Sequence, residues 1–161
     1  MEVTKDLLNQ LFEYKEGGLY WKVNRNSRAR KGQEAGTCLT SAGYKCLNLN
    51  YTMYATHRLI FLFHHGFLPE KIDHINGNKV DNRIENLRAA SVSENGWNAK
   101  KRVDNTSGVK GVWKHNQGKW AAELTMNKKK IWLGLFVEKE EAANAVKQYR
   151  EQHQKEFARH E

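Results

Sequence analysis

The chain has 161 residues and a formal net charge of +9, from 27 basic and 18 acidic side chains. This length accommodates one ordinary domain or two to three very small ones. The positive charge predicts an anionic polymer as partner. A membrane surface is a weaker alternative, because no apolar run approaches the ~20 residues that a membrane-spanning helix needs.

The positive charge is spread along the chain rather than gathered in one tail. Residues 1–70 carry nine basic and six acidic side chains, residues 71–103 seven and four, and residues 104–161 eleven and eight. Each segment therefore contributes a net charge of +3. Such an even spread is typical of a protein that lies along a polyanion.

The N-terminus and the two cysteines bear on the cellular compartment. Residues 1–6 mix acidic and basic side chains and lack the apolar stretch of a secretory signal. Cys38 and Cys46 form neither a zinc half-site nor, in a reducing compartment, a disulfide. We therefore expect a cytoplasmic protein that is not secreted, with both cysteines as structural thiols.

The first part of the chain predicts short elements. Thr4 caps a short amphipathic helix. The Gly17-Gly18 pair then leads into a strand over residues 19–22. Two extended runs, 44–49 and 51–55, predict a hairpin.

Residues 24–36 are polar and show no hydrophobic period. They carry the basic side chains of Arg25, Arg28 and Arg30, together with Lys31. The segment is either a solvated loop or a basic loop that contacts phosphates, and both interpretations stay open. The three arginines are kept as candidate nucleic-acid contacts.

A strongly apolar helix follows, capped by Thr56 and ended by Gly66. Apolar residues surround it almost completely, which predicts an element of the core. His57, His64 and His65 lie on this helix, and each is more often a structural histidine than a ligand. His57, in the first turn, is the one that could lie beside a site.

Polar side chains concentrate in residues 71–95. The Asp73-His74 pair is followed by Asn-Gly-Asn at 76–78, a tight turn that we expect between two short strands. Ser91-x-x-Glu94 then forms the reciprocal cap that starts a helix. This helix is expected to end at about residue 101 or 102, with Asn95 in its first turns.

The C-terminal part predicts a second small unit. The polar stretch 102–108 indicates a boundary or hinge. Three strands are expected over 109–113, 119–126 and 130–136, and Glu138-x-x-Glu141 opens a closing helix. The strands carry an excess of lysine and the helix a slight excess of acids, so the sheet should face the polyanion.

The residue types at 71–95 fit the hydrolysis of a phosphodiester. That reaction needs a base for water and relief of the charge that develops on the phosphate. Imidazole titrates near neutrality, so His74 can take the proton of water. Mg²⁺ takes oxygen ligands, usually one or two from the protein, and Asp73 and the side-chain carbonyl of Asn95 are suitable. Adjacent strand positions point to opposite faces, so Asp73 and His74 can have different roles.

The motif reads Asp73-His74-Ile-Asn-Gly-Asn-Lys-Val-Asp-Asn82-Arg-Ile-Glu-Asn86-Leu-Arg, with Ser93-Glu94-Asn95 after it. It resembles the HNH endonucleases of the phage and intron homing type. The resemblance implies a ββα-metal finger in which His74 is the general base and Asp73 and Asn95 hold a divalent ion, Mg²⁺ or Mn²⁺. It also implies that Asn86 fixes the loop and helps to orient the histidine, whereas Asn82 is expected to form a turn. Many relatives carry a histidine at the place of Asn95, which leaves the metal preference open.

The C-terminal segment reads Ser107-Gly-Val-Lys-Gly-Val-Trp113, with Gly118-Lys-Trp120 and Trp132-Leu-Gly-Leu-Phe136 further on. It resembles an AP2-type DNA-binding domain, in which a three-stranded sheet enters the major groove. For Trp120 and Trp132 a place in the core is equally open. Lysine cannot form the two-pronged contact of arginine with guanine, so phosphate binding is the safer expectation. The matching candidate DNA contacts are Lys110, Trp113, Lys114, Lys119, Trp120, Lys130 and Trp132.

The sequence thus predicts an α+β fold with a ββα-metal (HNH) finger and a small three-stranded antiparallel sheet with one helix. The expected regions are 1–55 with a helix, a hairpin and DNA contacts, 56–103 with the nuclease core, and 104–161 with the AP2-like domain. The expected function is metal-dependent nicking or double-strand cleavage of double-stranded DNA, by a monomer on DNA rather than a homodimer. The expected location is the host cytoplasm if a phage encodes the protein. The alternatives are a non-catalytic, sequence-specific DNA-binding regulator with a degenerate finger, and an RNA-processing enzyme.

Overall fold

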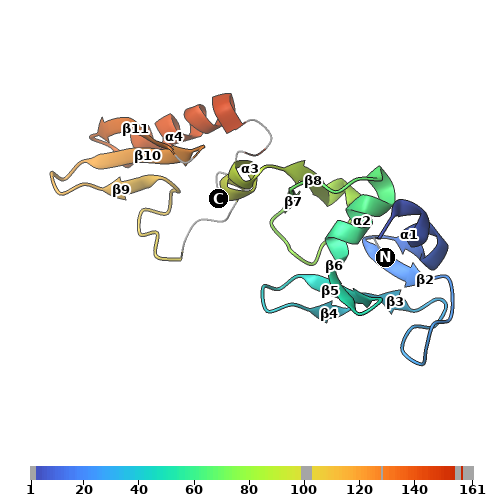
Figure 1. Cartoon of the computed structure of the whole chain (residues 1–161). Coiled ribbons are helices and arrows are strands. Elements are labelled where there is room, and N and C mark those ends of the chain that lie inside the picture. Colours follow the sequence, from blue (N-terminus) through green and yellow to red (C-terminus); the bar gives the residue numbers. More distant parts are fainter. Residues whose placement is uncertain (1–2, 99–102, 128, 155–156, 158–161) are drawn as a thin grey trace. The chain divides into compact units, whose positions relative to one another are not determined.

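The computed structural model describes residues 3–98, 103–127, 129–154 and 157 (Figure 1). The chain forms two compact units, Met1–Ala90 and Ser91–Glu161. Each unit has a hydrophobic core of its own. The fold mixes helices with small antiparallel sheets. The three functional regions expected from the sequence stay a prediction.

The first unit begins with a short helix, α1, and an antiparallel sheet in the order β1-β2-β3. Thr4 starts the helix as predicted, because its Oγ1 accepts a hydrogen bond from Leu7 N at 3.3 Å. Strand β1, which the sequence does not predict, pairs with β2 and brings Phe12 opposite Trp21 in the core. The elements are α1 (Lys5–Leu11), β1 (Phe12–Lys15), β2 (Gly18–Trp21) and β3 (Glu34–Ala35).

A second sheet of the first unit has the order β4-β5-β6 and contains the predicted hairpin. The hairpin turns at Asn50 and Tyr51, which both have positive φ (51° and 63°), the backbone that two-residue hairpins require. Cys38 lies opposite Cys46, and both are free thiols. The strands are β4 (Cys38–Leu39), β5 (Lys45–Leu49) and β6 (Thr52–Ala55).

Helix α2 (Thr56–His65) is a core element of the first unit, as predicted. Its N-cap is Ala55 rather than Thr56, because the Thr56 hydroxyl donates to Gly36 O at 3.4 Å instead of capping the helix. Gly66 ends the helix in the left-handed conformation (φ 78°), which glycine adopts at low cost. The buried apolar side chains of α2 are Leu59, Ile60, Phe61 and Leu62.

The predicted motif forms a two-stranded antiparallel sheet of β7 (Lys71–His74) and β8 (Leu87–Ala90). The second strand begins later than a tight turn at 76–78 predicts, because a loop and a 3₁₀ turn (Ile84–Asn86) intervene. Short polar side chains of this loop bond to the backbone two residues on, which competes with strand pairing. These bonds run from Asn78 N to Asn76 Oδ1 at 2.8 Å, from Val80 N to Asn78 Oδ1 at 3.2 Å and from Arg83 N to Asp81 Oδ1 at 3.4 Å.

The second unit begins with helix α3 (Val92–Trp97) and the predicted capping box. Ser91 Oγ accepts a hydrogen bond from Glu94 N at 3.2 Å, and Glu94 Oε2 accepts one from Ser91 N at 2.7 Å. The helix end expected at residue 101 or 102 lies outside the described residues.

The rest of the second unit is a three-stranded antiparallel sheet in the order β11-β10-β9, backed by one helix as the sequence predicts. Ala142 and Val146 of the helix pack on the sheet together with Val112 and Leu124. The elements are β9 (Val112–Lys114), β10 (Trp120–Met126), β11 (Lys129–Phe136) and α4 (Lys139–Gln154). In the described part of the chain, no helix combines the length and the apolar character that crossing a membrane requires.

Candidate functional site

Strand β7 places two neighbouring polar side chains in the interior of the first unit. Asp73 and His74 are only 4% and 5% exposed. Neighbouring residues of a strand point to opposite faces, and the two side chains accordingly have different partners. The hydrogen-bond partners described next, Asn82 and Arg88, come from the loop after β7 and from β8.

The imidazole of His74 is oriented by Asn82. Asn82 Oδ1 lies 2.9 Å from His74 Nε2, and the Asn82 side chain is 1% exposed. A carboxamide oxygen only accepts hydrogen bonds, so this contact places the ring proton on Nε2 and the lone pair on Nδ1. The Nδ2 atom of Asn82 is buried without a hydrogen-bond partner, which costs about 1–3 kcal/mol. The sequence predicts only a turn-forming role for Asn82, and the structure adds a hydrogen bond to the candidate base.

Asn86 holds the loop that follows β7. Its Oδ1 accepts a hydrogen bond from Asn76 N at 3.0 Å. Its Nδ2 donates to Asn76 Oδ1 at 3.0 Å and to Asp81 O at 2.7 Å. The loop-fixing part of the role expected for Asn86 is therefore present in the structure, whereas the hydrogen bond that orients the imidazole of His74 comes from Asn82.

Asp73 forms an ion pair with Arg88, which lies opposite it on β8. Nε and Nη2 of Arg88 donate to Asp73 Oδ2 at 2.9 and 2.8 Å. The sequence motif contains Arg88 but gives it no role, because the pairing depends on the register of the two strands. The guanidinium fixes the orientation of the carboxylate through two hydrogen bonds to a single oxygen.

Two further rings pack against His74. The ring centroid of His57, in the first turn of α2, lies 5.1 Å from that of His74, and the ring centroid of Tyr44 lies 6.0 Å away. His57 is 8% exposed. Burial, helped by the neighbouring His74 and Arg58, lowers the pKa of His57 to about 4, so this ring is neutral near pH 7. The expectation that His57 lies beside the site is confirmed.

The other two histidines of α2 have partners at the end of the helix. His64 Nδ1 lies 2.9 Å from Ile60 O, and the His64 ring packs edge-on against Tyr14 with centroids 4.4 Å apart. His65 is exposed and packs on Phe61. These contacts agree with the structural role that the sequence predicts for both.

The buried carboxylate of Asp73 is an oxygen donor of the kind that a hard divalent ion takes. Among the described residues, no group of three or more His, Cys, Asp or Glu side chains is arranged to hold a metal. Mg²⁺ needs only one or two protein ligands and takes water or phosphate as the rest. A single buried carboxylate such as that of Asp73 therefore suits Mg²⁺ better than a structural zinc ion, which needs four protein ligands. Asn95, the second expected ligand, is an exposed residue of α3 in the second unit.

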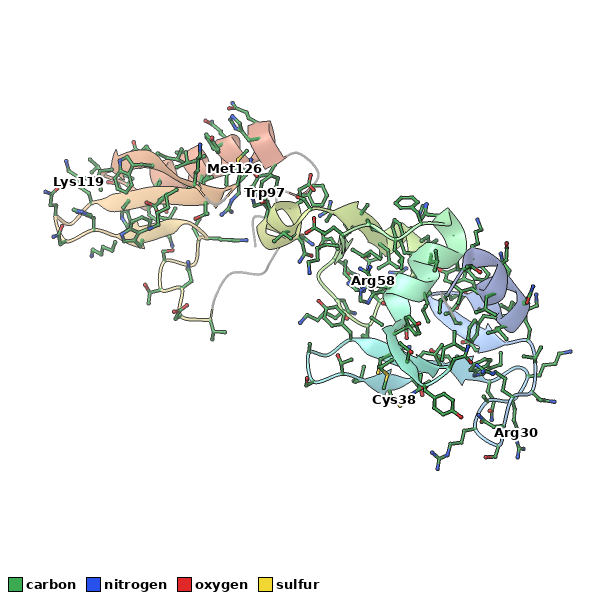
Figure 2. The ribbon with its side chains drawn as sticks, viewed as in Figure 1. Arg30, Cys38, Arg58, Trp97, Lys119 and Met126 are labelled. Atoms are coloured by element: carbon green, nitrogen blue, oxygen red, sulfur yellow. The ribbon has the colours of Figure 1, made fainter. Side chains whose placement is uncertain are left out.

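The basic loop of the first unit lies between β2 and β3. Arg25, Arg28 and Arg30 are exposed there, and Figure 2 shows Arg30 on this loop. Arg25 Nη2 donates to Asn50 Oδ1 at 2.6 Å, which ties the loop to the tip of the β5–β6 hairpin. Exposure of all three arginines is compatible with a solvated loop and with phosphate contacts, so their role stays a prediction.

The sheet of the second unit exposes two of the candidate tryptophans. Trp113 and Trp132 are 39% and 52% exposed, and their ring centroids lie 6.1 Å apart. Trp120 instead packs against the core cluster under α4. Trp120 is thus half-buried beside the core and Trp132 is exposed, whereas DNA contact by either tryptophan stays a prediction.

The candidate lysines of the second unit also divide into two groups. Lys114, Lys119 and Lys130 are exposed, and Figure 2 shows Lys119 in the connection between β9 and β10. Lys130 pairs with Glu123 at 3.2 Å. Lys110 is half-buried, and its Nζ donates to Trp97 O at 3.0 Å at the end of α3. Lys110 therefore supports the unit from inside, which makes it a weaker candidate for DNA contact than the exposed lysines.

Residues 54–97 match the family model described as HNH endonuclease. The matched segment contains the histidines and asparagines of the site, from His57 to Asn95. The match and the arrangement around His74 support a nuclease of the HNH family.

Two curated relatives each match about a third of the chain. One is Protein 3.8 of Escherichia phage T7, 44% identical over 55 residues, which are 34% of this chain and 46% of that protein. The other is the AP2/ERF and B3 domain-containing transcription factor RAV1 of Arabidopsis thaliana, 42% identical over 53 residues, which are 33% of this chain and 15% of that protein. The chain thus covers less than half the length of each relative. No solved structure matches it significantly.

Proposed function

We propose that this protein is a metal-dependent HNH endonuclease of the homing type, which hydrolyses phosphodiester bonds of double-stranded DNA. The observation that carries the proposal is the 2.9 Å contact between His74 Nε2 and Asn82 Oδ1. It lies within the segment that matches the HNH endonuclease family. It also gives the imidazole the tautomer that a general base needs, with the lone pair on Nδ1.

In the proposed reaction, His74 Nδ1 takes a proton from the attacking water. The resulting imidazolium keeps its Nε2–H on the Asn82 oxygen, so the neutral and the charged ring share one orientation. A positioned general base typically contributes 10²–10⁴-fold to the rate. Asn86 maintains the loop that carries Asn82, through its bonds to Asn76 and Asp81.

We propose that Asp73 holds the divalent ion, Mg²⁺ or Mn²⁺; Asn95, the second ligand that the resemblance implies, stays a prediction. When bound, such an ion relieves the negative charge that develops on the phosphate oxygens. Arg88 keeps the carboxylate of Asp73 in place through Nε and Nη2. This arrangement resembles the outer partners that orient ligands in metal sites.

DNA binding is assigned in this proposal to the exposed side chains of the second unit, with the basic loop as a further contact. Trp113 and Trp132 offer flat apolar surfaces, and Lys114, Lys119 and Lys130 offer charges for phosphates. Phosphate contacts position a protein on DNA without reading its sequence. A chain with one candidate base supports nicking by a monomer.

A plasmid assay tests the proposal. Supercoiled plasmid is incubated with the wild type, His74→Ala or the control His65→Ala, with Mg²⁺, Mn²⁺ or a chelator. We expect the wild type and His65→Ala to convert the plasmid to open circles with a metal and not with the chelator, and His74→Ala to be at least about 100-fold slower. A wild type that leaves a broad panel of DNA intact with both ions contradicts the enzymatic proposal. Equal cleavage by His74→Ala contradicts the role of its imidazole.

A DNA-binding regulator that does not cleave is the second candidate function. It is supported by the similarity to the plant transcription factor and by the exposed pair of Trp113 and Trp132. Band-shift measurements on the samples of the plasmid assay separate the two candidates, because a regulator binds DNA without metal-dependent cleavage. A structured RNA in the same assay tests the third alternative, which preferential cleavage of that RNA would support.

A further inference from the structure

The ring of His74 is enclosed by a wall of two other rings, His57 and Tyr44. The His57 and Tyr44 centroids lie 5.1 Å apart, and the His57 and His74 rings meet nearly edge-on, with an interplanar angle of 66°. The three rings come from α2, from the residue before β5 and from β7. Three separate elements therefore converge on the candidate base.

Neighbouring contacts hold both Tyr44 and His57 in place. Tyr44 N donates to Thr40 Oγ1 at 3.1 Å. Lys79 Nζ lies 5.0 Å from the centre of the Tyr44 ring and donates to Ala42 O at 3.0 Å, which ties the loop after His74 to the turn that carries Tyr44. The backbone of His57 is set by the start of α2, where the neighbouring Thr56 hydroxyl donates to Gly36 O.

The way in which His57 is held points to packing rather than hydrogen bonding. Its Nδ1 is buried without a hydrogen-bond partner, a situation that costs stability. A purely apolar ring would fill the same place without that cost. What the ring gives to the site is therefore its shape and its position against His74.

We propose that His57 is a positioning residue for His74: its buried ring holds the imidazole of His74 in the orientation in which Nε2 meets Asn82. This inference rests on the proposed role of His74 as general base. Asn82 fixes one edge of the imidazole by a hydrogen bond, and the wall of His57 and Tyr44 restricts rotation of the ring away from it.

The charge state of His57 is consistent with this role. The charged or titratable groups that face it are His74 from β7, Tyr44 from before β5 and Arg58 on its own helix. Burial and the two basic neighbours lower the pKa of His57 to about 4. A neutral His57 does not repel the imidazolium that His74 becomes when it takes a proton from water.

Three variants of the full chain test the inference: His57→Ala removes the ring, His57→Phe keeps its shape, and His65→Ala is a control on the same helix. Single-turnover cleavage at saturating protein, DNA affinity and the NMR signal of the His74 Nε2 proton are measured for each. We expect His57→Ala to cleave about 10- to 100-fold more slowly with unchanged DNA affinity and to lose the protected Nε2 proton signal. His57→Phe should recover most of the rate and retain the signal, and His65→Ala should match the wild type.

Two outcomes overturn the inference. One is a folded His57→Ala that cleaves at the wild-type rate. The other is a folded His57→Phe that is as slow as His57→Ala, since that would assign the effect to the ring nitrogens. If His57→Ala does not fold, His57→Phe decides alone, because the inference requires it to keep both the rate and the signal. A wild type that cleaves no DNA contradicts the proposed function, whereas the His74 proton signal still tests the positioning.

Discussion

The candidate site around His74 and the exposed sheet face of the second unit are built in opposite ways. In the site, the central polar side chains are buried and meet specific atoms, as His74 meets Asn82 and Asp73 meets Arg88. On the sheet, Trp113 and Trp132 stand partly in solvent among exposed lysines. A site of the first kind is lost through one substitution. A surface of the second kind loses affinity in small steps, because exposed charges contribute little each.

The largest effect is expected when one partner of a buried ion pair is removed. Arg88→Met leaves the buried carboxylate of Asp73 without its guanidinium, and we expect the free energy of unfolding of the first unit to fall by about 3 kcal/mol. The change in the free energy of unfolding is measured by urea denaturation, with hydrogen exchange of the β7 and β8 amides as the readout for the first unit. The control Arg83→Met removes the exposed guanidinium that pairs with Asp81 and should change stability little.

A double variant tests whether the loss in Arg88→Met comes from the unpaired charge. Asp73→Asn combined with Arg88→Met removes both charges, so part of the stability lost in Arg88→Met should return. An Arg88→Met protein as stable as the wild type would show that the pair does not hold the strands together. It would also remove the contrast between a specific interior and a tolerant surface.

The second test uses pH. The pKa of His57 is lowered from 6.5 to about 4 in the folded protein, so the unfolded chain binds the extra proton between these values. The contribution of His57 to the free energy of unfolding is therefore fully present above about pH 6.5. It decreases as the pH falls towards 4, by about 3 kcal/mol in total. Because other groups also titrate in this range, the difference between the wild type and His57→Phe isolates the contribution. Parallel stability curves for the two proteins would contradict the assignment.

The third test concerns rate rather than stability. Asn82→Ala removes the acceptor of His74 Nε2, so the imidazole loses its fixed tautomer and orientation. We expect single-turnover cleavage to slow by about 10- to 100-fold, with unchanged DNA affinity. Asn48→Ala, at an exposed position of β5, is the matched control. Slow cleavage by the control, or full activity of Asn82→Ala, would count against the oriented-base account.

The smallest effects are expected on the sheet of the second unit. Trp132→Ala should weaken DNA binding about tenfold, and Lys119→Ala should lower the slope of log affinity against log salt by about one. Neither should change the cleavage rate at saturating protein. Trp120→Ala is the contrast, because this half-buried side chain packs on the core cluster and its removal should lower the free energy of unfolding instead. Equal loss of affinity in all three variants would contradict the division between core and surface tryptophans.

What the sequence predicts well are features that depend on neighbours in the chain. The Thr4 cap, the Ser91 and Glu94 capping box and the Gly66 helix end are each set by side chains within one turn of the helix. The Asp73-His74 pair is likewise predicted from the sequence, because the motif around it is specific.

What the sequence does not predict depends on contacts across strands or loops. Arg88 meets Asp73 through the β7–β8 register. Asn82 reaches His74 only because Asn76, Asn78 and Asp81 turn the loop into side-chain hydrogen bonds instead of a second early strand. Trp120 and Trp132 both fit an alternating strand pattern, but a register shift between Ala122 and Glu123 changes the pairing along β10.

The most direct test of His74 as the general base is single-turnover cleavage by His74→Ala, with DNA affinity measured on the same sample. We expect the rate to fall by about 10²–10⁴-fold while DNA affinity equals that of the wild type. A His74→Ala protein that cleaves DNA at the wild-type rate would contradict that role.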